Sequence, residues 1–116
     1  MDVLTKENAL IGEKYYYTKH KSGLDIYLIP KEISTSYALF CTRYGAIDNC
    51  FKLEGDAEFT RVPDGIAHYL EHKMFENEDG SDAFEQFSLN GANANAYTAA
   101  SKTCYMFSCT DNFESN

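Results

Sequence analysis

One segment near the middle of the chain, residues 64–75, has the apolar periodicity of a helix and separates two groups of strand-like segments. Asp64 is a preferred type of N-cap residue and follows Pro63, so we expect the helix to run from about Gly65 to Phe75. Asp82 and Glu85 have the spacing of a capping box, which predicts a second helix beginning there. The chain therefore has to place two helices between strands.

The strand-like segments are rich in aromatic and β-branched residues and are bounded by glycine, proline or asparagine. They cover residues 15–19, 24–29, 37–44 and 103–109, with a further extended stretch at 95–99 and a loop or irregular hairpin at 49–61. Strands, then two helices, then strands predict an α+β fold in which a mostly antiparallel sheet packs against the helices. We expect residues 1–116 to form a single domain, truncated where Thr110 or Asp111 would begin another helix.

Charge excludes some classes of partner. The net charge is −8, and Arg43 and Arg61 are the only arginines, so a phosphate backbone would be repelled and we expect no nucleic-acid partner.

No apolar run reaches the roughly 20 residues that span a bilayer, and we expect no membrane partner. Residues 1–12 lack the basic flank and apolar centre of a signal peptide, which predicts a cytoplasmic protein.

The four cysteines do not have the spacing of a structural zinc site. Cys41, Cys50, Cys104 and Cys109 form no Cys-x-x-Cys pair, and the odd spacing of the last two places them on opposite faces of the predicted strand. We expect all four to be free thiols in a reducing compartment.

The predicted helix of residues 65–75 contains the pattern His-x-x-Glu-His. His68 and His72 are four residues apart, so both imidazoles lie on one face of the helix, and Glu71 lies beside them. We expect the apolar stripe of this helix to pack on the core and the stripe with the histidines to face a cleft. The first stripe comprises Ile66, Ala67, Leu70 and Met74, and the second comprises His68, Glu71, His72 and Phe75.

This pattern suits zinc chemistry. Imidazole nitrogen is a preferred zinc ligand, and a catalytic zinc lowers the pKa of a bound water to about 7. Glu71 would accept the proton of that water as the general base. Two histidines leave the ligand set incomplete, and no third ligand can be identified by spacing. A solvated helix face without a metal is the alternative interpretation of the motif.

A second segment, residues 90–98, has small residues and amides around an extended stretch. It is either a turn that leads into a strand or an exposed edge whose backbone pairs with a bound peptide, with an asparagine side chain bonding the peptide backbone.

These segments together resemble the insulinase/pitrilysin family of zinc peptidases, whose signature is the inverted motif H-x-x-E-H. Residues 65–72, followed by Met74-Phe75, are similar to the active-site helix of that family. Residues 91–98 and 103–107 resemble the next block of the family at the expected distance, and residues 37–45 fit the preceding strand. The resemblance extends from about Tyr15 onward.

The resemblance implies roles for individual residues. His68 and His72 match the two zinc-binding histidines of the family, and Glu71 matches its catalytic base. Asn95 and Ala96 match the pair at the edge strand where a peptide substrate adds as a β-strand. The third zinc ligand of the family is a glutamate that would lie beyond residue 116, and a second homologous domain, in cis or in trans, completes its chamber.

The resemblance implies a zinc metalloendopeptidase that hydrolyses peptides or small unfolded proteins, with this chain as the N-terminal part of its catalytic domain. Two alternatives remain open. The chain could belong to a non-catalytic subunit of the family, or it could be a fragment that is inactive by itself because the third zinc ligand is missing.

Overall fold

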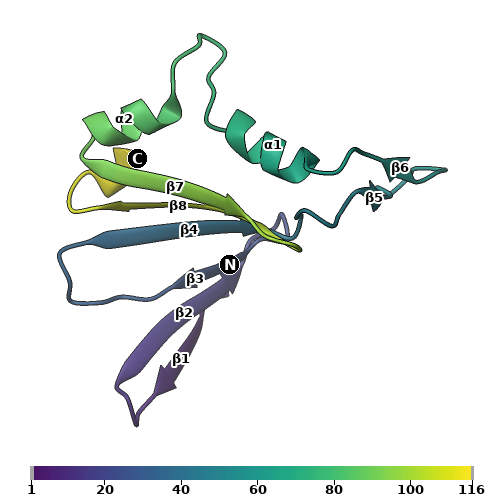
Figure 1. The fold of residues 1–116 in the computed structure, drawn as a ribbon. Helices are drawn as coiled ribbons and strands as arrows, with labels where there is room; N and C mark the ends of the chain where they lie inside the picture. Colours follow the sequence, from purple (N-terminus) through teal and green to yellow (C-terminus); the bar gives the residue numbers. More distant parts are fainter. Residues whose placement is uncertain (1, 116) are drawn as a thin grey trace. The chain divides into compact units, whose positions relative to one another are not determined.

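The computed structural model describes residues 2–115 and divides the chain into two compact units, one ending at Ile33 and the other beginning at Ser34. Antiparallel strands form both units, and two helices belong to the second (Figure 1). The prediction of an α+β fold with mostly antiparallel strands and helices packed on a sheet is therefore confirmed. None of the helices within residues 2–115 has the length and apolar character needed to cross a bilayer.

The first unit is a three-stranded antiparallel sheet in the order β1-β2-β3, where β1 is Leu4–Asn8, β2 is Glu13–Lys19 and β3 is Asp25–Leu28. Strands β2 and β3 were expected from their aromatic residues. The Tyr17 and Tyr27 rings, whose centroids are 5.1 Å apart, pack across these two strands. Strand β1 was not expected, because all five of its side chains are exposed and its sequence has no apolar alternation.

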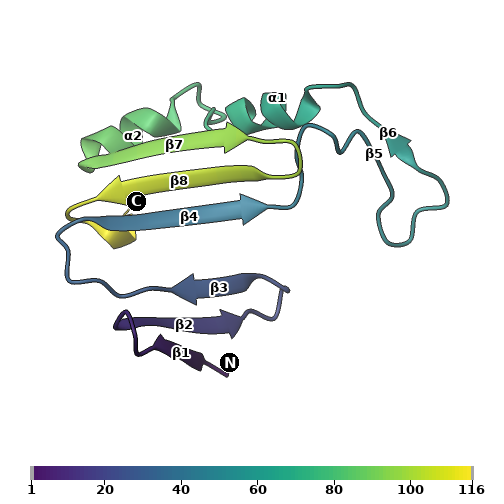
Figure 2. The same ribbon diagram turned by 60° about the horizontal axis from the view of Figure 1, so that its bottom comes forward.

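The second unit contains the sheet that matters for the site. Its order is β4-β8-β7, where β4 is Ser36–Thr42, β8 is Thr103–Cys109 and β7 is Ala92–Thr98 (Figure 2). Both pairings are antiparallel. Along β7, odd-numbered positions are exposed and even-numbered positions are covered, which is the two-residue alternation of a strand with one packed face. Strand β7 lies at an edge of this sheet.

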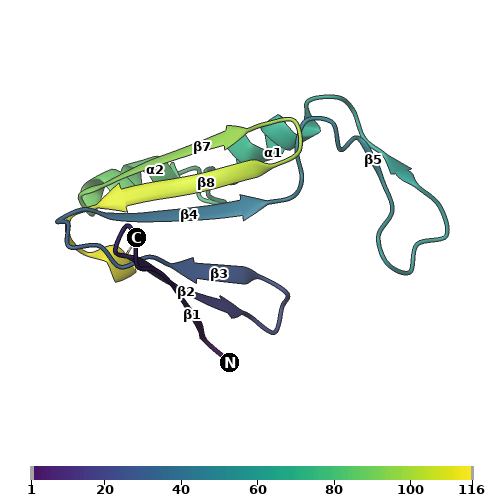
Figure 3. The same ribbon diagram turned by 90° about the horizontal axis from the view of Figure 1, so that it is seen from below.

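Both helices of the second unit cover the same face of that sheet. Helix α1 is Ile66–Lys73 and helix α2 is Ala83–Leu89; the view from below in Figure 3 shows the sheet in front of them. The remaining elements are the hairpin of β5 (Cys50–Phe51) and β6 (Thr60–Arg61) and the short 3-10 helix η1 (Phe113–Ser115).

The helix caps differ in how well they were predicted. Asp82 caps α2 as expected, because its side chain accepts a hydrogen bond from the Phe84 N–H at 2.8 Å. The N-cap of α1 is Gly65, with φ of 85°, and no side chain caps this helix. The expected cap, Asp64, instead accepts a hydrogen bond from the Asn49 amide at 2.7 Å, which ties the loop before α1 to the β5 region.

Aromatic rings fill much of the space between the helices and the sheet. Phe75 stacks on Phe84 with ring centroids 4.1 Å apart and approaches Tyr105 of β8 at 5.9 Å, and Phe87 of α2 packs on Phe107 at 5.6 Å. The space between the helices and the sheet also contains an apolar cavity of about 430 Å³. Rings from α2 and β8, together with Phe75 just after the end of α1, thus fix the distance between the layers.

The orientation of α1 differs from the prediction. Leu70 and Met74 were expected to face the core, but they are 48% and 63% exposed. Ala67 and Glu71 are the buried residues of this helix, at 2% and 8% exposed. A small residue and a hydrogen-bonded carboxylate lie one turn apart on the face toward the sheet, which lets the helix backbone approach β7 closely.

The cysteines also differ in part from the prediction. Cys41 of β4 and Cys104 of β8 are directly opposite in the register and are joined by a disulfide, so the expectation of free thiols is wrong for this pair. Their Cα atoms are 4.3 Å apart, the spacing of a non-hydrogen-bonded pair in an antiparallel ladder. Cys50 and Cys109 are free, the first exposed and the second buried.

Gly45 allows the chain after β4 to pass close to the turn between β7 and β8. A Cβ atom at this position would lie 2.4 Å from the Lys102 backbone nitrogen and 2.6 Å from the carbonyl oxygens of Ala99 and Ala100. The neighbouring Ala46 N–H donates to the Ala99 carbonyl at 2.9 Å, so the two backbones cannot move apart without losing this bond.

We expect Gly45→Ala to lower the free energy of unfolding by about 2–3 kcal/mol, because the methyl group would meet backbone atoms that have no room to yield. Urea denaturation followed by circular dichroism measures this loss. Gly55→Ala is the control: no heavy atom lies within 4 Å of its added Cβ, although its φ is 94°, so a loss of about 1 kcal/mol is expected. Equal losses in the two variants would contradict the steric argument.

Candidate active site

Helix α1 brings His68 and His72 together at its exposed surface. Their Nε2 atoms are 2.9 Å apart, and their ring centroids are separated by 4.8 Å with the planes tilted by 39°. Both side chains belong to exposed residues. A spacing of four residues on a helix places the imidazoles one above the other, and here the same nitrogen of each ring points to a common place.

This pair fits a zinc ion. Two imidazoles bound to one tetrahedral zinc, with Zn–N distances of about 2.0–2.1 Å, hold their nitrogens about 3.3 Å apart, so the two rings would only need to separate slightly. The nitrogens are available because, within residues 2–115, each is engaged only with the other. No three His, Cys, Asp or Glu side chains of these residues come together as a complete metal site. The two histidines thus supply half of a four-coordinate set.

Glu71 lies on the sheet side of the same helix and is only 8% exposed. Its Oε2 atom accepts a short hydrogen bond from the Thr98 hydroxyl, at the end of β7. An ionised carboxylate in such a place needs a donor, since an unpaired buried charge costs far more than a paired one. Thr98 therefore makes the burial of Glu71 tolerable.

Tyr105 shares this space with Glu71. Burial, and then the negative charge of Glu71, raise the pKa of the Tyr105 hydroxyl above its ordinary value. The phenol is thus neutral throughout the physiological range, and its ring packs near Phe75. The surroundings of Glu71 thus combine the hydroxyl donor of Thr98 with the neighbouring side chain of Tyr105.

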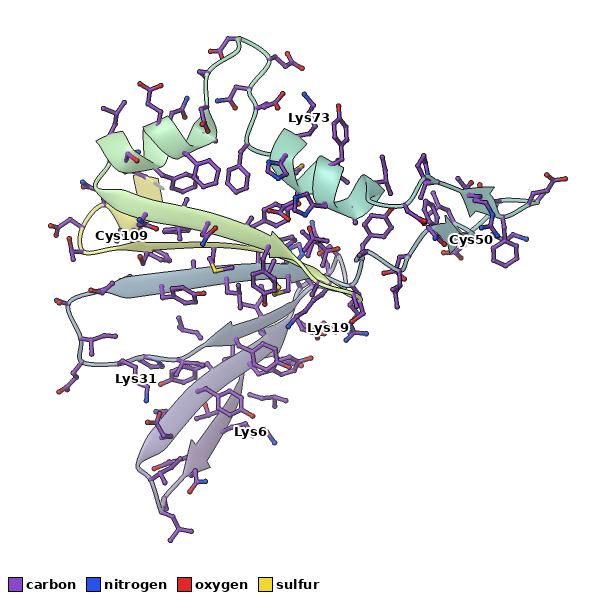
Figure 4. All side chains as sticks on the ribbon, viewed as in Figure 1. Lys6, Lys19, Lys31, Cys50, Lys73 and Cys109 are labelled. Atoms are coloured by element: carbon purple, nitrogen blue, oxygen red, sulfur yellow. A yellow bond between two sulfur atoms is a disulfide. The ribbon has the colours of Figure 1, made fainter. Side chains whose placement is uncertain are left out.

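Lys73 ends the helix on the opposite side. It forms an ion pair with Glu76, and its Nζ lies 5.7 Å from the centroid of the Tyr69 ring. The side chain points away from the sheet (Figure 4), which separates this cation from Glu71. Glu76 and Tyr69 both raise the pKa of Lys73. The lysine therefore belongs to a solvated surface.

Strand β7 presents an open edge beside α1. Because Cys41 and Cys104 form a non-hydrogen-bonded pair, Cys104 directs its backbone groups toward Tyr97 of β7. Antiparallel alternation then directs the backbone groups of Ala96 and Thr98 away from β8, toward the open edge. The Asn95 side chain occupies one hydrogen-bonding group of that edge, because its Oδ1 accepts a hydrogen bond from the Ala96 N–H at 2.8 Å.

The predicted residues fall into two groups. His68, Glu71 and His72 share α1, while Asn95 and Ala96 lie on β7, which α1 contacts. Nothing in the sequence indicated that Thr98, which lies in the segment 90–98, is a hydrogen-bond partner of Glu71. A threonine after alternating alanines carries no local signal of a partner 27 residues away.

The arrangement can hold a cation at the two exposed imidazoles and move a proton at the buried carboxylate next to them. An extended peptide could pair with the backbone of β7 alongside. These three capabilities, metal binding, proton transfer and strand pairing, are those that metal-assisted amide hydrolysis requires.

Comparisons with known proteins agree with this arrangement. The sequence profile described as Insulinase (Peptidase family M16) matches residues 57–113. The chain is 51% identical over 111 residues to an uncharacterized zinc protease, YmfH, of Bacillus subtilis (strain 168), covering 95% of this chain and 26% of that protein. It is 30% identical over 101 residues to an insulin-degrading enzyme homolog of Dictyostelium discoideum, covering 83% of this chain and 10% of that protein.

A solved structure is similar as well. The crystal structure of an M16-like peptidase from Alicyclobacillus acidocaldarius superposes with a TM-score of 0.77 and 35% sequence identity. The match covers 99% of this chain and 24% of that protein. The chain thus spans about a quarter of the length of these two bacterial relatives.

Proposed function

Because this chain belongs to the insulinase family, peptidase family M16, we propose that it carries the zinc-binding helix and general base of a metalloendopeptidase that acts on peptides or small unfolded proteins. The observation that carries the proposal is the pair of imidazole nitrogens, 2.9 Å apart, beside a carboxylate that is 8% exposed. A solvated helix face would leave all three side chains exposed, whereas here the carboxylate is buried and bonded.

The proposed mechanism assigns a separate role to each side chain. His68 and His72 would hold zinc through Nε2. Zinc bound there would polarise the scissile carbonyl and acidify a water molecule. Glu71 would accept a proton from the attacking water as the water oxygen bonds the carbonyl carbon, and would then donate that proton to the leaving amine as the C–N bond breaks. Burial of Glu71 limits the water that could compete for this proton.

The edge of β7 would receive the substrate as an additional strand. An extended peptide would pair with the outward-directed backbone groups of Ala96 and its neighbours, so that affinity comes from main-chain hydrogen bonds. Asn95 would have to release the Ala96 N–H when the peptide arrives, and its amide could then bond the peptide backbone. This mode of binding depends little on side chains and suits a peptidase with broad specificity.

The proposal includes parts outside this chain. A third zinc ligand is needed, because residues 2–115 supply two histidines and no complete set. We place this ligand beyond residue 116 and expect a second homologous domain, in cis or in trans, to enclose the substrate. The partners that we propose are a peptide and this domain, with no nucleic acid or membrane.

The cytoplasm is the proposed compartment, and the Cys41–Cys104 disulfide bears on it. Such bonds are rare where glutathione and thioredoxin keep thiols reduced. A cytoplasmic location would therefore make this bond, which links β4 to β8, an exception to that rule.

Zinc-dependent hydrolysis tests the proposal. We expect the zinc-loaded protein, assayed alone and with the proposed second domain, to cleave fluorogenic peptides, and a chelator to lower the rate by at least about 10³-fold. Added zinc should restore the rate. Hydrolysis that survives chelation would contradict the metal mechanism, and tight zinc binding without hydrolysis would favour a non-catalytic subunit.

A further inference from the structure

We infer that Thr98 is a positioning residue for the general base, because its hydroxyl holds one oxygen of Glu71 and leaves the other for proton transfer. This inference rests on the proposed function for its catalytic consequence. The hydrogen bond itself is a feature of the fold and can be tested without activity.

The two carboxylate oxygens of Glu71 have different surroundings. Oε2 accepts the hydrogen bond from the Thr98 hydroxyl. Oε1 has no hydrogen-bond partner among residues 2–115. A carboxylate has about four sites for accepting hydrogen bonds, so one donor at Oε2 leaves Oε1 fully able to take a proton.

Thr98 is well suited to hold a side chain in place, because the backbone around it is fixed on two sides. Opposite it in β8 is Thr103, whose hydroxyl donates to the Tyr44 carbonyl at 2.8 Å. The turn that follows is bound through the Ala99 and Ala100 carbonyls, which accept from Ala46 and Ile47 at 2.9 and 3.0 Å. A β-branched side chain also has few rotamers, so the hydroxyl has little freedom to turn away.

The effect on catalysis follows from the flexibility of glutamate. Its three side-chain torsions would have to be ordered before each proton transfer, and the entropy of that ordering would add to the barrier. With Oε2 held by Thr98, that ordering is already present in the folded protein. In the first step, a water O–H bond breaks as its proton moves to Oε1 of Glu71, and the water oxygen forms a bond to the carbonyl carbon. In the second step, the proton moves from Oε1 to the leaving nitrogen as the C–N bond breaks.

The first test compares Thr98→Val with Thr98→Ser. Valine keeps the shape and removes the donor, while serine keeps the donor and removes a methyl group. We expect Thr98→Val to lower kcat by roughly tenfold with KM changed by less than about twofold, and Thr98→Ser to stay within about threefold of the original kcat. Thr42→Val is the matched control, since Thr42 is opposite Thr103 at the same end of the sheet and does not bond Glu71.

The second test observes the carboxylate directly, in protein that holds no metal. Carbon-13 NMR of protein labelled at the glutamate side-chain carboxyl, with the Glu71 signal assigned by its loss in Glu71→Gln, should show that signal shifted in Thr98→Val. The signal should stay near its original position in Thr98→Ser and Thr42→Val. Zinc affinity, measured by competition with a chromophoric chelator, should stay within about twofold in all three variants, because none removes a ligand.

The outcomes separate this inference from the proposed function. An unshifted Glu71 signal in Thr98→Val, or an unchanged kcat in a protein that Glu71→Gln inactivates, would overturn the role of Thr98 and leave the peptidase proposal standing. Loss of zinc affinity in parallel with kcat would also overturn it, since a structural role would then explain the result. A protein that never hydrolyses peptides would refute the proposed function, and the NMR signal would still decide whether Thr98 holds Glu71.

Discussion

Glu71→Gln is expected to lower kcat for peptide hydrolysis by about 10²–10⁴-fold while zinc affinity stays within about twofold. Glutamine has nearly the same shape, and its carbonyl oxygen can still accept the hydrogen bond from Thr98. It cannot accept a proton at neutral pH, so binding is preserved and proton transfer is lost. Steady-state kinetics and zinc titration on the same preparation measure both quantities.

Glu85→Gln is the matched control for this prediction. Glu85 is exposed in the first turn of α2, so the same change of charge away from α1 should alter kcat by less than about twofold. Undiminished turnover in Glu71→Gln would show that another group serves as the base. A parallel loss of zinc affinity would show that Glu71 contributes to metal binding instead.

His68→Ala should have the largest effect on the metal, lowering zinc affinity by at least about a hundredfold. The remaining imidazole of His72 would have lost its partner across the 2.9 Å separation and could offer only a single nitrogen. Isothermal titration calorimetry or chelator competition measures the affinity, and circular dichroism should show the fold retained, because the residue is exposed.

His20→Ala is the corresponding control. His20 is the third histidine of the chain and lies in the first unit, where its Nδ1 is 2.8 Å from the Ser22 hydroxyl. Its removal should leave zinc affinity unchanged. Equal binding by the original protein and by His68→Ala would mean that zinc is held elsewhere, and the assignment of the metal site would be wrong.

The sequence predicted elements best where the local pattern matches the tertiary role. Residues 103–109 alternate between the two faces of a central strand, and β8 has the same bounds as the prediction. Residues 4–8 form β1 without such a pattern, because this strand is held by backbone pairing to β2 and all its side chains are exposed. Backbone pairing of this kind depends little on side-chain type, so it produces no recognisable pattern in a single sequence.

The motif was easier to find than its orientation. Spacing alone places His68, Glu71 and His72 on adjacent parts of a helix, and the structure has them so. The apolar stripe with Leu70 and Met74 was the natural choice for the buried face, yet Glu71 is buried instead. A hydrogen bond to Thr98, on a distant strand, offsets the cost of burying the carboxylate, and helix periodicity cannot reveal such a partner.

The disulfide illustrates the same limit for cysteines. Cys41 and Cys104 are separated by 63 positions, and only the register between β4 and β8 makes them direct neighbours. Once that register is known, the pairing follows from the close approach of a non-hydrogen-bonded position. Sequence spacing could exclude a zinc ribbon, but it could not find a partner across the sheet.

The difference in exposure between the imidazoles and the carboxylate has a consequence for maturation of the protein. The histidines open to solvent, so an ion can arrive, exchange or be delivered by a carrier without unfolding of α1. The carboxylate is already set against the sheet by folding alone. The buried carboxylate and its hydrogen bond are features of the folded chain itself, so we expect their geometry to be the same before and after an ion binds at the histidines.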